Sequence, residues 1–324
     1  MVGRRPLLPH AASLGKVISD IHMRVAVLGG SGLIGSATAA RLAALGCVVT
    51  IMTRSKPSHL PDGCDWESAD IVDAAATQEA LAAVGPEAVL HLAAFLQYGC
   101  EQDPAQAVRV NIDGTMNVLE ACRALGVRRL VFASSIAAYG EREDLMREED
   151  SPNARTGLYG MTKRIGEMLG ERYAALHGLQ FVALRYAGVF GPGEVHSPGL
   201  ALVRQRIKEC AAGHDVVVDG ATGEERSHLT HVTDAAEATC RATLHAAPRH
   251  RIYNVGGPPG NHIRLREFHD AVRALVPGAG NALWKGRGKG SGPVDLSRLR
   301  DDLGFTPSVS VEAGLRADLL AKRA

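Results

Sequence analysis

The chain has 324 residues, enough for one large or two small domains, and its 36 Lys and Arg residues nearly balance its 35 Asp and Glu residues. This balance gives no general attraction to nucleic acid or to an anionic membrane surface. Hydrophobic residues make up 46% and charged residues 22%, which excludes a disordered, collagen-like or coiled-coil chain.

Two further features bear on the class of protein. No apolar run approaches the length of a membrane span, so we expect no membrane partner. The six cysteines form no C-x-x-C pair. They therefore predict neither a disulfide framework nor a zinc site, and they favour a cytoplasmic protein.

Strand-like and helix-like segments alternate along the first part of the chain. Residues 1–22 are expected to form a loose N-terminal extension, because Met23 stands directly before the first apolar run. Strands separated by helices indicate βαβ units and a parallel sheet. The sequence therefore predicts a doubly wound α/β Rossmann domain over residues 23–187. We expect its strands at 24–28, 48–52, 88–92, 129–133 and 180–186, and its helices at 33–45, 77–84, 104–125 and 159–177.

The pattern changes after Gly188, where segments become shorter and prolines interrupt them. Residues 188–250 and 257–324 are expected to form a smaller C-terminal lobe that binds the substrate. The run 251–256 between them is apolar enough to return to the main sheet as a further strand.

A glycine-rich turn follows the first predicted strand and precedes the first predicted helix. Residues 29–35 read Gly-Gly-Ser-Gly-Leu-Ile-Gly, which matches the spacing of a dinucleotide fingerprint. Glycines let the backbone approach a pyrophosphate, and the helix N-terminus offers N–H groups to the anion. The residues expected to bind the cofactor here are Gly29, Gly32, Leu33, Ile34 and Gly35.

The end of the second strand indicates which nicotinamide dinucleotide is bound. An acidic residue there would bind the ribose 2′-hydroxyl of NAD. The sequence instead continues Thr53-Arg54-Ser55-Lys56. Arg54 could meet the 2′-phosphate of NADP, although a solvated arginine in a loop is the plainer interpretation. The sequence thus favours NADP over NAD and leaves both open.

Tyr159 and Lys163 lie four residues apart and share one face of a predicted helix. A free phenol is a poor base at neutral pH, and a nearby ammonium lowers its pKa. The tyrosine would then serve as a general acid or base. Ser134 and Ser135 end the preceding strand, where a hydroxyl could hold the substrate oxygen.

Together these segments resemble the extended short-chain dehydrogenase/reductase family, also described as the NAD-dependent epimerase/dehydratase family. The resemblance covers residues 23 to about 320. Its further motifs are Asp70-Ile71, His91-Leu92-Ala93-Ala94, Asn111-Ile112-Asp113-Gly114-Thr115, Ser134-Ser135-Ile136-Ala137-Ala138-Tyr139-Gly140, Leu184-Arg185-Tyr186 and Tyr253-Asn254-Val255-Gly256.

The resemblance implies roles for single residues. Ser135 would be the catalytic serine, because it stands four residues before Tyr139, and Tyr159 would be the acid/base. Lys163 would bind the nicotinamide ribose and lower the pKa of the tyrosine. The other residues that it implies on the cofactor side are Asp70, Ile71, Leu92, Ala93, Ala94, Asn111 and Tyr186. On the substrate side they are Ser135, Gly188 and Arg226. Apart from the resemblance, His196 in the segment 193–199 is a candidate substrate contact, and an ordinary loop histidine is an equal alternative.

Four departures from the family pattern bear on the reaction. Leu28 stands where a threonine is usual before the first glycine. No Asp-Glu pair lies between Ser135 and Tyr139, and similar sugar dehydratases use such a pair as acid and base, so loss of water is not expected. Gly188 takes the place of an asparagine that commonly touches the substrate in nucleotide-sugar enzymes. The segment from Arg226 to Asp234 is one residue longer than usual. The last two departures weaken the case for a nucleotide sugar.

Three functions remain in competition. The first is an NAD(P)-dependent oxidoreductase that transfers a hydride between the nicotinamide and a secondary alcohol or ketone of a sugar-like or other small polar substrate. The second is a sugar or nucleotide-sugar 4-epimerase with tightly held NAD, and the third is a non-catalytic dinucleotide sensor. No metal site is expected at His228 and His231, and no nucleic-acid site at the basic loop 284–290. A homodimer through helices 104–125 and 159–177 is expected from the resemblance.

Overall fold

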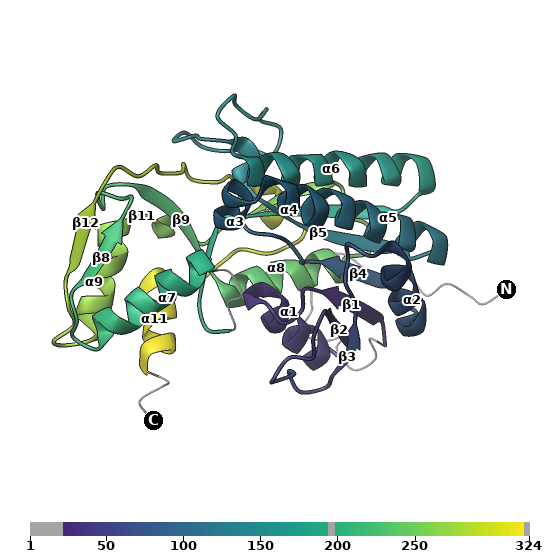
Figure 1. Cartoon of the computed structure of the whole chain (residues 1–324), viewed down its shortest axis with the longest axis horizontal. Coiled ribbons are helices and arrows are strands. Elements are labelled where there is room, and N and C mark those ends of the chain that lie inside the picture. The colour runs from purple at the N-terminus through teal and green to yellow at the C-terminus, as the bar shows by residue number, and fades with distance from the viewer. Residues whose placement is uncertain (1–21, 194–197, 321–324) are drawn as a thin grey trace.

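The computed structural model describes residues 22–193 and 198–320. The predicted Rossmann-type α/β fold is confirmed by a parallel sheet of seven strands in the order β10-β6-β5-β4-β1-β2-β3 (Figure 1). The strands of this main sheet are β1 (Arg24–Leu28), β2 (Val48–Thr53), β3 (Cys64–Ser68), β4 (Ala88–His91), β5 (Arg129–Ser135), β6 (Gln180–Tyr186) and β10 (Ile252–Val255).

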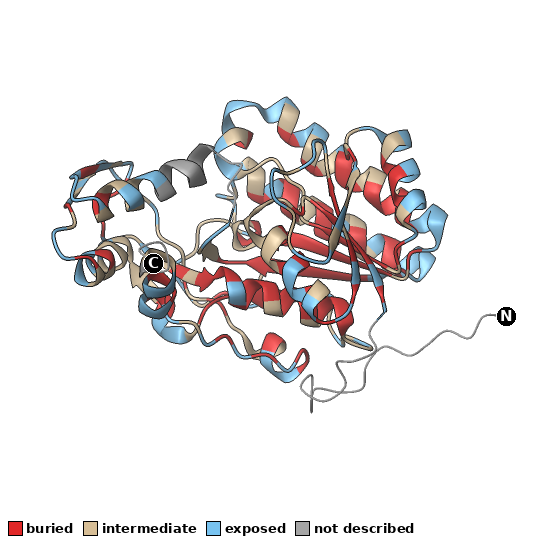
Figure 2. Ribbon diagram, turned by 90° about the horizontal axis from the view of Figure 1, so that it is seen from below, coloured by how far each residue is buried: buried red, intermediate tan, exposed pale blue. Residues whose placement is uncertain are grey.

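Helices cover both faces of the main sheet, and each face has its own apolar core. On one face lie α2 (Ala74–Val84), α5 (Gly114–Leu125) and α6 (Leu158–His177). On the other lie α1 (Leu33–Ala44), α8 (Val232–Leu244) and α10 (Ser297–Asp301). The strands between these layers are largely buried (Figure 2), as near-continuous apolar runs in a parallel sheet require.

The helix expected over residues 104–125 contains an irregular turn. It consists of α4 (Pro104–Val108), a π-helical turn (Arg109–Asp113) and α5, and the short helix α3 (Gln97–Gln102) precedes it. Such a π-turn adds a residue to one turn of a helix and often lies at a functional site. Here it carries Asn111, a residue expected on the cofactor side.

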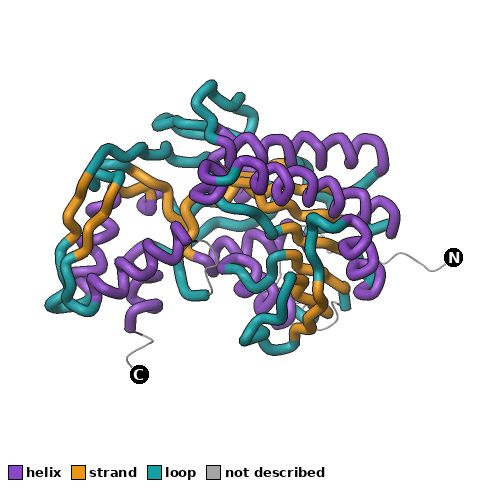
Figure 3. The backbone as a smooth tube through the Cα atoms, viewed as in Figure 1, coloured by secondary structure: helices purple, strands orange, loops and turns teal. Residues whose placement is uncertain are grey.

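The smaller lobe lies beside the carboxyl end of the main sheet (Figure 3). Its elements form a separate apolar cluster. Its strands are β7 (Gly188–Phe190), β9 (Arg226–His231) and β11 (His262–Arg264) in one sheet, and β8 (Val216–Asp219) and β12 (Ala282–Lys285) in another. Its helices are α7 (Pro198–Ala211), α9 (Leu265–Leu275) and α11 (Val311–Leu320).

Two helices from the segments assigned to the lobe cover the main sheet instead. Helix α8, within 188–250, buries its alanine-rich face against α1, and α10, within 257–324, packs on β10. Residues 292–293 also connect the lobe to the main domain through two backbone hydrogen bonds. Gly292 N–H donates to Arg142 O at 2.7 Å, and Met146 N–H donates to Pro293 O at 2.9 Å. The lobe is thus tied to the loop that follows β5.

The register of the main sheet brings the carboxyl ends of its central strands to one edge. Leu28 of β1 pairs with His91 of β4, and His91 pairs with Phe132 of β5. At the end of β5, Ser135 pairs with Tyr186 of β6. In open α/β sheets this edge is where ligands bind.

Among the described residues, none of the helices combines the length and the apolar character that crossing a bilayer requires.

Candidate functional site

The glycine turn after β1 packs against the end of β4. Gly29 has a φ of +78°, and a Cβ there would lie 2.6 Å from the backbone nitrogen of Ala93. A Cβ on Gly35 would lie 2.5 Å from the carbonyl oxygen of Gly29. Gly32 directly precedes α1 and carries no side chain that could cover the first N–H groups of the helix, which belong to Leu33 and Ile34. A pyrophosphate therefore fits this turn.

The tip of β2 lies beside this turn, since Gly29 N–H donates to Met52 O at 2.9 Å. Thr53 Oγ1 donates to the carbonyl of Ser55 at 2.8 Å and accepts from the Trp66 indole at 2.9 Å. These two bonds shape the turn that carries Arg54, whose side chain is exposed. The hydroxyl of Thr53 thus supports the loop.

Asp70 and Ile71 follow β3 on the same side of the sheet. The Asp70 carboxylate accepts from Val72 N–H at 3.2 Å. Ile71 is buried, and its side chain lies where a Cβ on Gly114 would need to be. Its carbonyl accepts from Asn117 at 2.9 Å. Ile71 therefore connects this edge of the sheet to α5.

Leu92, Ala93 and Ala94 continue β4 and are half-buried. Asn111 in the π-helical turn is buried and holds the chain that follows them. Its amide accepts from Phe95 N–H at 2.8 Å and donates to Phe95 O at 2.9 Å and to Thr162 of α6 at 3.1 Å. Asn111 thus fixes the loop after β4 against the helix that carries Tyr159.

Ser135, Tyr159 and Lys163 meet where β5 ends against the first turns of α6. The hydroxyl of Ser135 accepts from Ala137 N–H at 3.1 Å and acts to lower the pKa of the Tyr159 phenol. The ammonium of Lys163 donates to the carbonyl of Ala133 at 2.8 Å and lies 5.6 Å from the centre of the Tyr159 ring. Gly160 permits this close packing, because a Cβ there would lie 2.0 Å from the carbonyl oxygen of Ala137.

Burial dominates the protonation of this group. It raises the pKa of Tyr159 well above its ordinary value, the Cys100 thiol adds to the rise, and the hydrogen bond with Ser135 opposes it. Burial also lowers the pKa of Lys163 to about 8, while the electrostatic interactions with Cys100 and with the Glu167 carboxylate act in the opposite direction. Burial therefore outweighs the lowering of the tyrosine pKa that the lysine was expected to cause.

Two charged residues behind this group were given no role by the sequence analysis. The carboxylate of Glu167 accepts from Arg185 Nε and from an Arg185 terminal nitrogen, both at 2.7 Å. It also accepts from the hydroxyl of Ser134 at 2.6 Å. Glu167 lies one helical turn beyond Lys163, so the i, i+4 spacing was available as a signal.

The remaining predicted residues lie apart from the catalytic group or outside the described residues. Tyr186 is buried, and its hydroxyl bonds to Thr239 of α8 at 2.7 Å, so its side chain belongs to the core. Gly188 starts β7 and pairs with Leu229. Arg226 is exposed and donates to the carbonyl of His262 at 3.0 Å. His196 lies outside the described residues.

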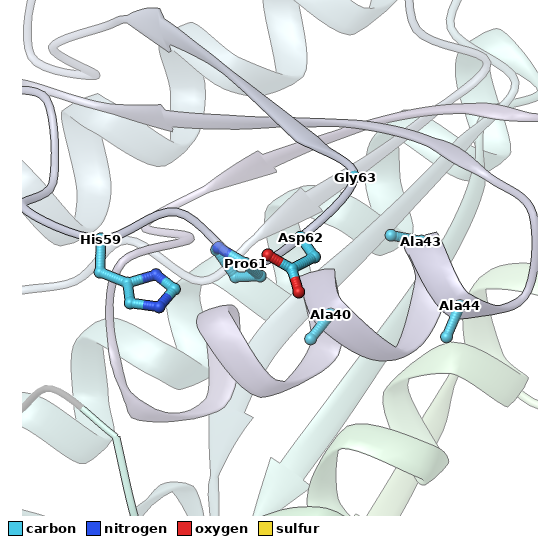
Figure 4. A pocket seen from close by; sticks show the side chains of 7 residues that line it. All are labelled: Ala40, Ala43, Ala44, His59, Pro61, Asp62 and Gly63. Carbon is cyan, nitrogen blue, oxygen red and sulfur yellow. The ribbon is translucent and has the colours of Figure 1, made fainter.

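Other polar clusters and hollows differ from this site. No group of three or more His, Cys, Asp or Glu residues suited to a metal occurs in 22–193 and 198–320. His228 has both ring nitrogens engaged, with Gly257 O at 2.9 Å and Val294 N–H at 3.1 Å. A hollow of about 580 Å³ lies between α1 and the loop before β3 (Figure 4), and none of the predicted site residues lines it.

Comparison with known proteins places this geometry in context. The sequence pattern of the NAD dependent epimerase/dehydratase family matches residues 25–256. A UDP-glucose 4-epimerase of Streptomyces lividans is 31% identical over 313 residues, which cover 90% of this chain and 92% of that protein.

Solved structures give the same result. The UDP-glucose 4-epimerase of Thermus thermophilus in complex with NAD superimposes with a TM-score of 0.84 at 29% identity, and covers 93% of this chain and 99% of its own. That of Thermotoga maritima with UDP-glucose gives a TM-score of 0.84 at 25% identity and the same coverage.

Proposed function

The chain belongs to the NAD dependent epimerase/dehydratase family, and within this family we propose that it catalyses reversible oxidation of a secondary alcohol on a sugar-like substrate with exchangeable NADP(H). It is an enzyme of the nicotinamide-dependent oxidoreductase type. The observation that carries the proposal is the meeting of Ser135, Tyr159 and Lys163 at the sheet edge that also bears the glycine turn.

When bound, the nicotinamide supplies or accepts the hydride. Tyr159 takes the hydroxyl proton in oxidation and returns it to the carbonyl oxygen in reduction. Ser135 donates a hydrogen bond to the same oxygen and fixes the reacting carbon. Lys163, held by Ala133 O at 2.8 Å, keeps a positive charge beside the ring of Tyr159, and this charge works against the burial that raises the pKa of the phenol.

The other site residues would hold the cofactor along the sheet edge. Gly29, Gly32 and Gly35 let the chain approach the pyrophosphate, and the N–H groups of Leu33 and Ile34 bind it. Asp70 and Ile71 would line the adenine side, and Leu92, Ala93 and Ala94 the middle of the dinucleotide. Asn111 keeps the loop after β4 in place for this contact.

The preference for NADP is supported by the tip of β2. Thr53 and Arg54 stand where an acid would bind the ribose diol of NAD, and the exposed Arg54 guanidinium suits a phosphate. Such a preference would distinguish the protein from the Thermus thermophilus UDP-glucose 4-epimerase, whose structure contains NAD. An exchangeable NADP(H) in turn suits a reductase.

A second function, a nucleotide-sugar 4-epimerase with retained NAD, is favoured by the relatives. The two cited solved structures and the Streptomyces lividans protein are all UDP-glucose 4-epimerases. Against it stand Gly188, which presents no side chain to a substrate, and Arg226, which is engaged by the carbonyl of His262.

One experiment separates the two. The purified protein is denatured, the released nicotinamide nucleotide is identified and quantified against protein, and the dissociation constants of NADPH and NADH are then measured. An empty protein that binds NADPH more tightly supports the oxidoreductase. Near-stoichiometric NAD, together with interconversion of UDP-glucose and UDP-galactose, would establish the epimerase. Indifference to both coenzymes would contradict both proposals and favour a non-catalytic protein.

We further propose a cytoplasmic homodimer. Met161, Met168 and Leu176 are each more than half exposed and lie on one face of α6, and Val108 of α4 and Leu125 of α5 are exposed apolar residues as well. The described cysteines are all free thiols, as in a reducing compartment. Sedimentation of Met168→Glu tests the assembly, since a charge at this position is expected to shift a dimer to monomers.

A further inference from the structure

The Glu167–Arg185 ion pair lies directly behind the catalytic group. Both carboxylate oxygens are engaged: one accepts from Arg185 Nε at 2.7 Å and Ser134 at 2.6 Å, the other from Arg185 and Arg164, both at 2.7 Å. The side chains of Glu167 and Arg185 are almost completely buried. Burial works to raise the pKa of Glu167, but the bonds and charge of Arg185 outweigh it and hold the pKa below its ordinary value.

The position of this pair connects three elements of the site. Glu167 lies four residues after Lys163 on α6, and Ser134 and Arg185 are paired neighbours at the ends of β5 and β6. Ser134 directly precedes the catalytic Ser135. Any rotation or sliding of α6 against the strand ends would break the three hydrogen bonds that this buried carboxylate accepts from Ser134 and Arg185.

From this geometry we infer that Glu167 is a positioning residue for Lys163. It fixes α6 against β5, which keeps Lys163 on the carbonyl of Ala133, and it places a negative charge one turn from the ammonium. Arg185 holds the carboxylate in place and partly neutralises it, with its guanidinium 4.4 Å from the centre of the Tyr139 ring. The inference rests on the proposed role of Lys163 at the nicotinamide.

The charged and titratable groups around Lys163 show why this carboxylate matters. His91 of β4 is held neutral, because burial and Lys163 lower its pKa to about 3. Cys100 of α3 and Tyr159 of α6 have raised pKa values through burial, so both are neutral near pH 7. Glu167 is therefore the ionised carboxylate whose charge counteracts the lowering of the Lys163 pKa by burial. Arg185 and Arg164 are cations paired with this carboxylate, and they weaken its effect on the lysine.

Two variants of the same pair give opposite expectations. In Glu167→Gln the ammonium loses a stabilising charge, so the pKa of Lys163 should fall by about one unit. In Arg185→Met the carboxylate keeps Ser134 and Arg164 but loses its main counter-charge, so the pKa of Lys163 should rise or stay unchanged. Both variants break the ion pair. If Glu167 only stabilised the fold, the titration midpoint of Lys163 would therefore shift in the same direction in both variants.

The test follows Lys163 itself by the ¹³C NMR signal of its Cε in protein labelled at its seven lysines. Lys163→Met assigns the signal. Asp302→Asn is the matched control, because Asp302 is a buried carboxylate that accepts from Arg249 and Tyr253 on the opposite face of the sheet. In Asp302→Asn the titration midpoint of Lys163 should equal that in the wild type.

A midpoint in Glu167→Gln equal to that of the wild type, or moved in the same direction as in Arg185→Met, would overturn the inference. If Glu167→Gln does not fold, Glu167→Asp keeps the charge and shortens the reach, and it should retain the midpoint while lowering kcat about tenfold. This titration needs no substrate. A normal set of shifts without turnover would therefore contradict the proposed function and leave the inference intact.

Discussion

Arg54 offers the sharpest test of coenzyme choice. Its side chain is exposed at the tip of β2, so its attraction to a 2′-phosphate acts through water. Each pair of unit charges about 4 Å apart in water contributes about 1 kcal/mol, and the phosphate carries nearly two charges. Arg54→Ala should therefore cost about 2 kcal/mol, a loss of roughly 30-fold in NADPH affinity, and should leave NADH affinity unchanged.

The assay is the fluorescence titration of the reduced coenzymes at low ionic strength, repeated in about 1 M salt, where screening should remove most of the difference. Arg316→Ala is the matched control, because Arg316 is an exposed arginine paired with Glu312 on α11 in the other lobe. A wild type that prefers NADH, or an NADPH-to-NADH ratio that Arg54→Ala leaves unchanged, would refute the assignment.

Three further predictions concern catalysis and stability. Tyr159→Phe should lower kcat by about 10²- to 10⁴-fold and leave the dissociation constant of NADPH nearly unchanged; full activity would refute the acid/base role. Because burial lowers the pKa of Lys163 from 10.5 to about 8, the unfolded chain binds more protons in this window. The stability of the wild type relative to Lys163→Met should therefore rise with pH from 8 to 10.5, by up to about 3 kcal/mol in urea unfolding. Arg129 is buried and donates to Thr243 O at 2.9 Å at the end of α8, so Arg129→Met should lower the free energy of unfolding by about 3 kcal/mol, whereas the exposed Arg123→Met should not.

The elements of the main sheet were predictable because their signals are local. The largely apolar segment 180–186 forms β6 with the predicted boundaries. The helix predicted over 33–45 is observed as α1, which ends one residue earlier, at Ala44. Strand β3 was not predicted, because Cys64–Ser68 is a short, half-buried edge strand with alternating polar residues. Cys64–Ser68 forms a strand because it pairs in parallel with β2, and this long-range pairing leaves no local signal in the sequence.

The site was predictable to the extent that it depends on spacing along the chain. Tyr159 and Lys163 share a helix face, and Ser135 ends a strand at the same edge, so their meeting followed from the fold. The side chain of Tyr186 lies in the core because alternate residues of a strand face opposite sides. Arg185 and Glu167 come from separate elements, so their ion pair and the burial that shifts the pKa of Tyr159 required the packed structure.

The position of β10 in the sheet has a consequence for synthesis on the ribosome. This strand pairs with β6, but the chain first passes through β7, α7, β8, β9 and α8 before it reaches Ile252. Until then the edge of β6 has no partner, and the face that α10 covers remains open. The nascent main domain must therefore carry an unpaired strand edge, a site of chaperone binding or aggregation, while about 65 further residues emerge.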